Sequence, residues 1–200
     1  IVDDFRIVAS APDLKRLRDA GARIILASHN GRYEDVKLNR AGYSLAPVAK
    51  RLSELLGSLV ALSSQTVGAE ARAQVDALQD GQVLMLENLR STSAEEGGDA
   101  SYAEALADTV RPDAYVFLAF SAAHRGKHAS IGPMIDVLRR RQPGIPVIGG
   151  GLVHRELAGL RAFLTDPKAP ESAVAVLGGA KVTDKIEVMR ELILNHRVKT

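Results

Sequence analysis

Short apolar runs alternate along this chain with longer segments in which apolar residues recur at helical spacing. Val, Ile and Leu dominate the short runs, as they do in strands that are buried on both faces of a sheet. The alternation predicts an α/β fold, with a mostly parallel sheet and helices on both faces in three αβα layers. Strands are expected at 22–27, 59–62, 83–86, 114–118 and 173–177, and helices at 44–56, 67–78, 102–110, 133–141 and 152–164.

A further helix is predicted near the start of the chain from its capping signals. Ser10 is a capping residue, Pro12 lies in the first turn, and Asp13 follows the cap by three residues, which resembles a capping box. Gly21 is expected to end this helix.

Polar segments separate the expected elements. Residues 33–43 and 91–100 are predicted to be loops, the second because it is rich in Ser, Glu and Gly. Two prolines and polar neighbours at 165–170 mark the best candidate for a domain boundary. We therefore expect one domain over 1–170 and the opening strand and helix of another over 171–200.

The composition excludes several classes of protein. The net charge of +2 predicts no general attraction to nucleic acid or to a membrane, and the absence of cysteine excludes disulfides. Aromatic residues make up 4% of the chain, without tryptophan, which weighs against stacking platforms for bases. No apolar run has membrane-spanning length and no signal peptide opens the chain, so the cytoplasm is the expected location.

Cationic residues follow the predicted strands. Arg32, Arg90 and Arg125 each lie a few residues past a strand, and His29 lies in the first of these segments. Ligands of open parallel sheets bind beyond the carboxyl ends of the strands, so these side chains are expected to form a basic pocket. Guanidinium groups suit a small ligand that carries phosphate and carboxylate.

A simpler alternative remains open for each of these residues. Each Arg would be a solvated loop residue, or would pair with a nearby acid such as Glu34 or Glu87. His29 would donate to a ligand carboxylate or be an ordinary polar loop residue. Glycines at 149–151 would approach a phosphate or, as we favour, form a flexible entry to the next helix.

A second candidate site lies at Gly178–Lys185, between the last expected strand and an amphipathic segment. The Gly-Gly turn allows close approach of the backbone to a ligand, and free N–H groups at a helix N-terminus attract anions. Lys181 and Lys185 are four residues apart and share one face of the first turn. The segment is interpreted as a phosphate-binding turn or as an ordinary strand-to-helix turn with solvated lysines.

Six motifs, taken in order, resemble those of phosphoglycerate kinase. The resemblance spans nearly the whole chain but about half of that family's fold, which consists of two Rossmann-like domains. It implies phosphoryl transfer between ATP and 3-phosphoglycerate, giving 1,3-bisphosphoglycerate and ADP in glycolysis. The motifs are Asp3 to Ile7, Ser28 to Arg32, Ser44 to Ala49, Leu86 to Arg90, Ala122 to Arg125 and Leu177 to Lys185.

The resemblance also implies roles for individual residues. Arg6 and Lys181 would be catalytic, with Lys181 nearer the transferred phosphoryl group. Mg²⁺ would accompany ATP or ADP, without a metal site made by named side chains. The clamp for 3-phosphoglycerate would consist of Arg6, His29, Arg32, Arg90 and Arg125, and the nucleotide phosphates would contact Gly178, Gly179, Ala180, Lys181 and Lys185.

The chain departs from the family pattern at several positions. The family's first strand would precede Ile1, and its adenine pocket would follow the last residue, so ATP or ADP is expected to bind weakly or not at all. Asn30 and Tyr33 replace Leu and Pro of the Ser-His-Leu-Gly-Arg-Pro motif, which is expected to loosen the loop after the first strand. Residues 126–128 alter the spacing after Arg125.

Three interpretations therefore stay open. The chain would be a monomeric, truncated phosphoglycerate kinase whose turnover of ATP is impaired. Alternatively, it would be a binding module that holds a phosphorylated carboxylic acid without catalysis. In the third, it would be a structural fragment whose exposed sheet edge pairs with another chain.

Overall fold

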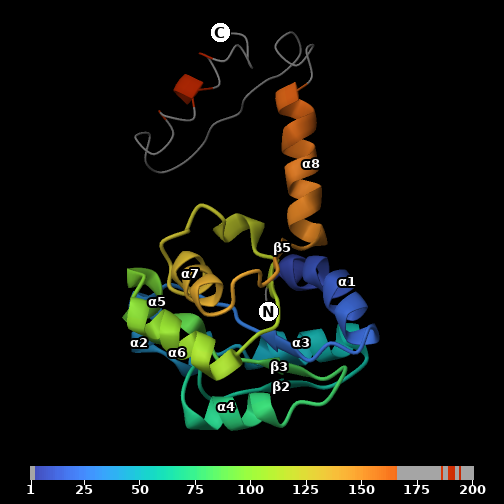
Figure 1. Ribbon diagram of the computed structural model, residues 1–200, viewed down its shortest axis with the longest axis vertical. Coiled ribbons are helices and arrows are strands. Elements are labelled where there is room, and N and C mark those ends of the chain that lie inside the picture. Colours follow the sequence, from blue (N-terminus) through green and yellow to red (C-terminus); the bar gives the residue numbers. More distant parts are fainter. Residues whose placement is uncertain (1–2, 166–185, 187–188, 192–193, 195–200) are drawn as a thin grey trace. The chain divides into compact units, whose positions relative to one another are not determined.

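The computed structural model describes residues 3–165, 186, 189–191 and 194 (Figure 1). By its internal contacts the chain divides into two units, Ile1–Val153 and His154–Thr200. All of the sheet structure described below belongs to the first unit. The strand expected at 173–177 lies outside the described residues, as does most of the proposed boundary at 165–170.

The first sheet consists of three parallel strands, β1 (Ile24–Leu26), β2 (Val60–Leu62) and β3 (Val83–Met85). Their order is β1-β3-β2, and Val83 of the central strand is in register with the first residue of each neighbour. The parallel arrangement confirms the prediction. Because the strands share one direction and register, the segments that follow them leave from the same edge.

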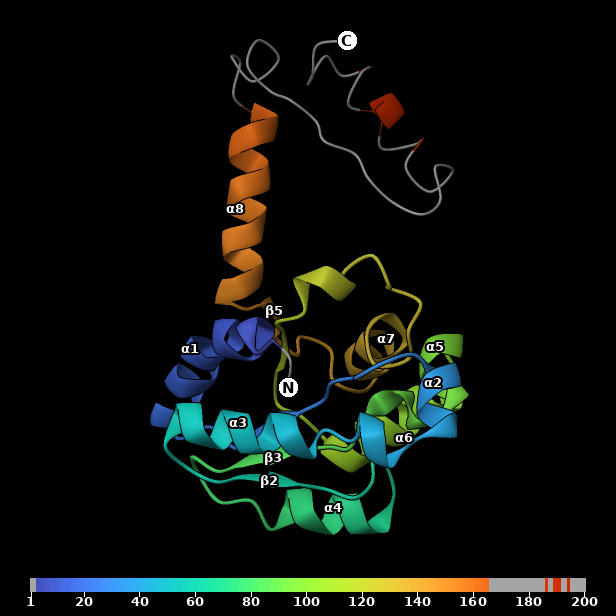
Figure 2. The same ribbon diagram turned by 180° about the vertical axis from the view of Figure 1, so that it is seen from behind.

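Side chains of this sheet alternate between two apolar layers. Val83 and Met85 pack with helices α1 (Phe5–Asp19) and α3 (Ala46–Leu56) in one buried cluster. Leu84, between them, packs on the other face against α4 (Ala69–Asp76). Figures 1 and 2 show α3 and α4 on opposite faces of β2 and β3. The predicted three-layer αβα architecture is therefore confirmed.

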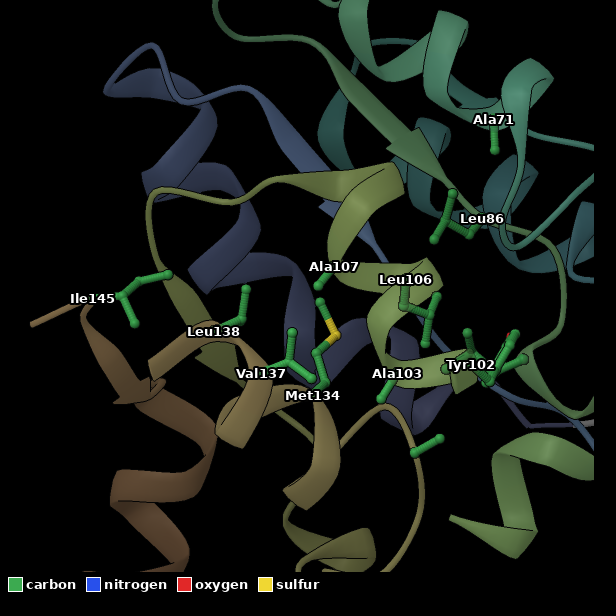
Figure 3. Close-up of a cluster of buried hydrophobic side chains, with 12 residues drawn as sticks. Ala71, Leu86, Tyr102, Ala103, Leu106, Ala107, Met134, Val137, Leu138 and Ile145 are labelled. Atoms are coloured by element: carbon green, nitrogen blue, oxygen red, sulfur yellow. The ribbon is translucent and has the colours of Figure 1, made fainter. Parts of the chain in front are cut away.

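A second parallel pair, β4 (Tyr115–Phe117) and β5 (Val147–Gly149), forms a separate two-stranded sheet. Beside it, α6 (Ala100–Val110) packs on α7 (Gly132–Arg141), and their small and branched side chains interdigitate, as Figure 3 shows. β5 was not predicted, because two of its three residues are exposed and a short run ending in glycines carries no strand signal.

The start of the first helix differs from the prediction. α1 begins at Phe5, so Ser10 lies inside the helix, where its hydroxyl donates to the Ile7 carbonyl at 2.8 Å instead of capping a helix end. Pro12 is also inside the helix. The extra turns are stabilised by packing, because Ile7 contacts the cluster that includes Leu14. Tertiary burial thus outweighs the local capping signal.

Both predicted loops contain short helices. Residues 33–43 form α2 (Tyr33–Leu38) and a 3₁₀ turn, η1 (Ala41–Tyr43), and residues 91–100 include α5 (Ser93–Gly97). The helices α2 and α5 have six and five residues, too few for a periodic pattern, and each has one buried side chain, Val36 and Glu95 respectively. The remaining elements are η2 (Leu89–Ser91), η3 (Phe120–Ala122) and α8 (Gly151–Thr165).

No helix among the described residues has the length and apolar character needed to cross a membrane.

Candidate functional site

The segments that follow β1 and β3 remain side by side beyond the sheet. The Leu86 amide donates to the Leu26 carbonyl at 2.9 Å, and the Leu89 amide donates to the Ser28 carbonyl at 3.0 Å. The backbone ladder therefore continues into the two segments that carry His29 and Arg90.

Asn88 joins these two segments through all of its side-chain hydrogen-bonding groups. Its Oδ1 accepts the backbone N–H groups of Arg90 at 3.0 Å and Asn30 at 3.3 Å. Its Nδ2 donates to the carbonyls of Asn30 at 2.7 Å and Tyr43 at 2.9 Å. With 2% of its surface exposed, Asn88 holds the two cationic segments in a fixed relation.

Replacing Asn88 with aspartate is expected to lower the free energy of unfolding by about 2 kcal/mol or more. The carboxylate has nearly the same shape but cannot donate, so two buried carbonyls lose their partners. Urea unfolding measures the change. Asn39→Asp is the matched control, because the exposed Asn39 side chain accepts from the Gly42 amide and donates to no group within the described part of the chain. A shift within about 0.5 kcal/mol is expected there. Equal losses in both variants would contradict this role of Asn88.

Neither acid considered as a partner for the arginines pairs with them. Glu34 forms an ion pair with Lys37. Glu87 accepts from the Leu45 amide at 2.8 Å and from the Ser44 hydroxyl at 2.7 Å, so it satisfies donors just before α3.

Arg90 is buried, with 4% of its side chain exposed. One guanidinium nitrogen donates to the Gly31 carbonyl, and Nε lies 3.1 Å from the Glu96 carboxylate. Its Nη2 is buried without a hydrogen-bond partner among the described residues. Burial lowers the pKa of Arg90, Glu96 raises it, and the nearby Arg125 lowers it further. Arg90 therefore pairs with an acid, as the simpler alternative supposed, but the acid is Glu96.

Arg32 and Arg125 have a different environment. Both are close enough to lower the pKa of Arg90, after burial and the opposing effect of Glu96. Arg32 is exposed and Arg125 is half-buried. Within the described residues neither side chain has a hydrogen bond or an ion pair. The structure thus brings three guanidinium groups together and leaves two of them unpaired there.

Arg6 is exposed in the first turn of α1. In the part of the chain that the structure describes, it makes no hydrogen bond or ion pair with the other four clamp residues.

His29 lies among these cations. Burial is the main reason why its pKa falls from its ordinary value of 6.5 to about 4, and Arg90 and Arg125 lower it further. Burial also lowers the pKa of His128, which the Glu95 carboxylate partly offsets. Both imidazoles therefore favour the neutral form.

The lowered pKa of His29 predicts how stability varies with pH. Between pH 6.5 and about 4 the unfolded chain binds a proton at His29 that the folded chain does not, so this contribution is complete above pH 6.5 and is lost as the pH falls toward 4. The unfolding free energy of the wild type minus that of His29→Gln is expected to be larger at pH 7.5 than at pH 5, by urea unfolding. The same difference at both pH values would contradict the burial of a neutral His29.

The loop after β1 is anchored rather than loosened by the residues that depart from the family motif. Asn30 uses its backbone N–H and C=O in the bonds to Asn88, so its side chain is not needed there. The Tyr33 amide donates to Glu96 at 3.2 Å, a bond that proline could not make.

Three residues that connect the segments of the candidate site are not predicted from the sequence. Asn88 lies within one of the motifs, and Glu95 and Glu96 lie in a segment predicted to be a loop. The sequence does contain one signal for the acids: Glu95 and Glu96 follow Arg90 by a few residues. A buried arginine requires a nearby anion, so an adjacent acid is a candidate partner.

The glycines at 149–151 do not form a free anion site. The Leu152 amide at the start of α8 donates to Asp13 Oδ2 at 3.2 Å, so a carboxylate from α1 already lies at this helix N-terminus. A Cβ atom on Gly151 would lie 2.7 Å from Asp13 Oδ1, and one on Gly150 would collide with Leu118. Glycine is required here for close packing, which the flexible-entry interpretation did not foresee.

The second candidate site, Gly178–Lys185, lies outside the described residues. The roles of Lys181 and Lys185 therefore stay predictions.

The sequence model of the family described as "Phosphoglycerate kinase" matches residues 1–197. Among curated relatives, the phosphoglycerate kinase of Kineococcus radiotolerans is 45% identical over 196 residues, and one from a Synechococcus strain is 43% identical over 200 residues. Each alignment covers 96% of this chain, but 45% and 46% of the respective relative. The chain thus spans about half the length of the curated relatives it matches.

Solved structures agree with these matches. The crystal structure of phosphoglycerate kinase from Pyrococcus horikoshii OT3 superposes with a TM-score of 0.79 at 27% identity, over 99% of this chain and 47% of that one. The structure of phosphoglycerate kinase from Coxiella burnetii gives 0.73 at 31% identity, over 96% and 45%.

Proposed function

The chain belongs to the phosphoglycerate kinase family, and from that premise we propose that it binds 3-phosphoglycerate at the carboxyl edge of its parallel strands. In this proposal it is the substrate-binding half of an enzyme that transfers a phosphoryl group between ATP and 3-phosphoglycerate, giving 1,3-bisphosphoglycerate and ADP.

The observation that carries the proposal is the pair of guanidinium groups of Arg32 and Arg125 beside buried Arg90. Like charges held close together repel one another, and after burial, which is the largest cause, Arg90 and Arg125 also lower the pKa of His29. An anion between the strand ends would relieve this repulsion. Arg side chains bind phosphate and carboxylate bidentately, so a ligand carrying both groups at opposite ends suits several arginines from separate loops.

The chemistry of the reaction matches such a site. Transfer of a phosphoryl group to a carboxylate needs no strong base, because the nucleophile is already ionised. It needs positioning and positive charge near the transferred group. Arg32, Arg125 and His29 would contact the ligand directly. Arg90 would bind the Gly31 carbonyl and add positive charge to the site. Arg6 would add a further positive charge from α1.

The nucleotide part of the proposal rests on the resemblance. Lys185 and the turn at 178–181 would hold nucleotide phosphate, and Lys181 would neutralise charge on the transferred group. We propose weak binding of ATP or ADP to the 200-residue chain, which spans about half the length of its relatives.

Magnesium, which the family's use of ATP implies, is a separate matter. Mg²⁺ prefers oxygen ligands and is usually held by one or two carboxylates together with substrate phosphates. The residues that the structure describes contain no group of three His, Asp or Glu side chains able to hold a metal. We therefore assign no magnesium ligand among the described residues and derive no step through the ion.

A non-catalytic anion-binding module is the alternative function, and the family matches do not favour it. Both functions require the same clamp, and they differ in whether ATP-dependent product forms.

Calorimetric titration of the 200-residue chain tests the proposal. We expect 3-phosphoglycerate to bind, glycerate, which lacks the phosphate, to bind at least tenfold more weakly, and ADP to bind weakly. A coupled assay with ATP would separate the enzyme from the module. No heat or chemical-shift change at millimolar 3-phosphoglycerate would overturn both functions.

A further inference from the structure

We propose that Glu95 of α5 is a positioning residue that holds the segment carrying Arg125 in its binding conformation. This segment, residues 125–131, is called the Arg125 loop below. The inference rests on the proposed binding of 3-phosphoglycerate and assigns the orientation of one clamp arginine to a carboxylate that makes no contact with the ligand.

Glu95 fixes the Arg125 loop through both its side chain and its backbone. Its Oε2 accepts from the Ser130 amide at 3.0 Å, and its Oε1 accepts from the Ser130 hydroxyl at 2.6 Å. The Glu95 carbonyl accepts from the Ala129 amide at 2.9 Å. His128 Nδ1 lies 3.7 Å from Oε1. Glu95 is 2% exposed, and all of these contacts of its carboxylate and its backbone carbonyl are with the Arg125 loop.

The far end of α5 also touches this loop. Gly98, the C-terminal cap of α5, has a φ of +69°, and a Cβ atom there would collide with the Lys127 carbonyl. The backbones of α5 and the Arg125 loop are therefore in close contact, with no room for a side chain between them.

Further hydrogen bonds hold the Arg125 loop together. The His128 amide donates to the Arg125 carbonyl at 3.0 Å, and the Gly132 amide donates to the Gly126 carbonyl at 3.1 Å. The Tyr115 hydroxyl of β4 donates to the Ser130 carbonyl at 3.0 Å. A shift at Ser130 would therefore move the whole turn and the arginine at its start.

The sign of its charge argues that Glu95 is present for position rather than for ligand attraction. A buried carboxylate beside an anion site repels the ligand, and removing its charge alone would tighten binding. A carboxylate is nevertheless the group that can accept from two donors of Ser130 at once. If Glu95 positions the loop, neutralising it weakens ligand binding. If only its charge matters, neutralising it tightens ligand binding.

The experiment compares Glu95→Gln with the wild type in the full 200-residue chain. Glutamine keeps the size but presents an N–H₂ group toward one of the Ser130 donors. We expect the affinity for 3-phosphoglycerate to fall about tenfold or more, and exchange of the Ser130 amide hydrogen in the ligand-free chain to become faster. Unchanged or tighter binding would overturn the inference, since only the charge would then matter.

Two controls separate positioning from a general loss of stability. Thr109→Val removes a buried hydroxyl that accepts from the Gly68 amide and donates to the Ala105 carbonyl, away from the Arg125 loop, and is expected to leave binding unchanged. Glu96→Gln removes the neighbouring carboxylate of the same helix, which contacts Arg90 and Tyr33, and should not change exchange at Ser130.

Failure of the inference and failure of the proposed function give different results. If the wild type does not bind 3-phosphoglycerate, the proposed function is wrong. The part of the inference that concerns binding of this ligand is then wrong as well. Exchange at Ser130 then still shows whether Glu95 holds the loop. If the wild type binds and Glu95→Gln binds equally well, the proposed function stands and the inference alone is wrong.

Discussion

Replacing Arg90 with methionine is expected to lower the free energy of unfolding by about 3 kcal/mol. Methionine retains much of the apolar stem but leaves the Gly31 carbonyl without its donor and the Glu96 carboxylate without its cation. Breaking a buried ion pair typically costs about 3–5 kcal/mol. The lower end applies here, because the Glu96 side chain remains 29% exposed and water compensates part of the loss.

Arg111→Met is the matched control for this result. It also removes an arginine from an ion pair, but Arg111 and Asp76 are each about half exposed, and such pairs contribute about 0–1 kcal/mol. Urea unfolding of the two variants measures the difference. Similar losses in both would show that Arg90 does not stabilise the edge of the sheet in the way that its burial indicates.

Replacing Arg125 with alanine is expected to weaken binding of 3-phosphoglycerate by about ten- to 150-fold. A hydrogen bond to a charged group contributes about 1.5–3 kcal/mol, and this arginine has no protein partner among the described residues that could compensate. For the same reason little change in stability is expected. Titration calorimetry gives the affinity, and urea unfolding checks the fold.

Arg139→Ala controls for the change in net charge. Arg139 is exposed in the last turn of α7, so the variant loses one positive charge away from the strand ends. Its affinity for 3-phosphoglycerate is expected to stay within about twofold of the wild type, since exposed charges at a distance are screened by salt. Equal weakening by both variants would mean that binding depends on net charge and not on the clamp.

Much of the fold could be predicted from periodicity alone. The strands at 24–26, 60–62, 83–85 and 115–117 were predicted to within two residues at each end, because each is a short apolar run. β5 was missed because it is half exposed, and α2 and α5 were missed because they are shorter than two helical turns. Such elements are stabilised by distant partners, which local sequence does not reveal.

The site could be predicted in part. Placing arginines after parallel strands predicts convergence, and Arg32, Arg90 and Arg125 do lie near one another. The sequence does not predict that Arg90 is buried and paired while Arg32 and Arg125 are not, since the burial of Arg90 depends on Glu96 and on the carbonyl of Gly31. Asn88 and Glu95 act through backbone groups on other segments, and backbone contacts leave no signature in side-chain spacing.

The central claim is that cationic side chains from three separate strand ends form one binding site for 3-phosphoglycerate. NMR spectroscopy of the arginine Nε–H groups and the histidine rings, during titration with this ligand, tests it most directly. We predict that the signals of Arg32, Arg125 and His29 shift together and give a single dissociation constant, with His29 moving toward the protonated form. Signals that stay unchanged at millimolar ligand, or that titrate with different constants, would contradict the account.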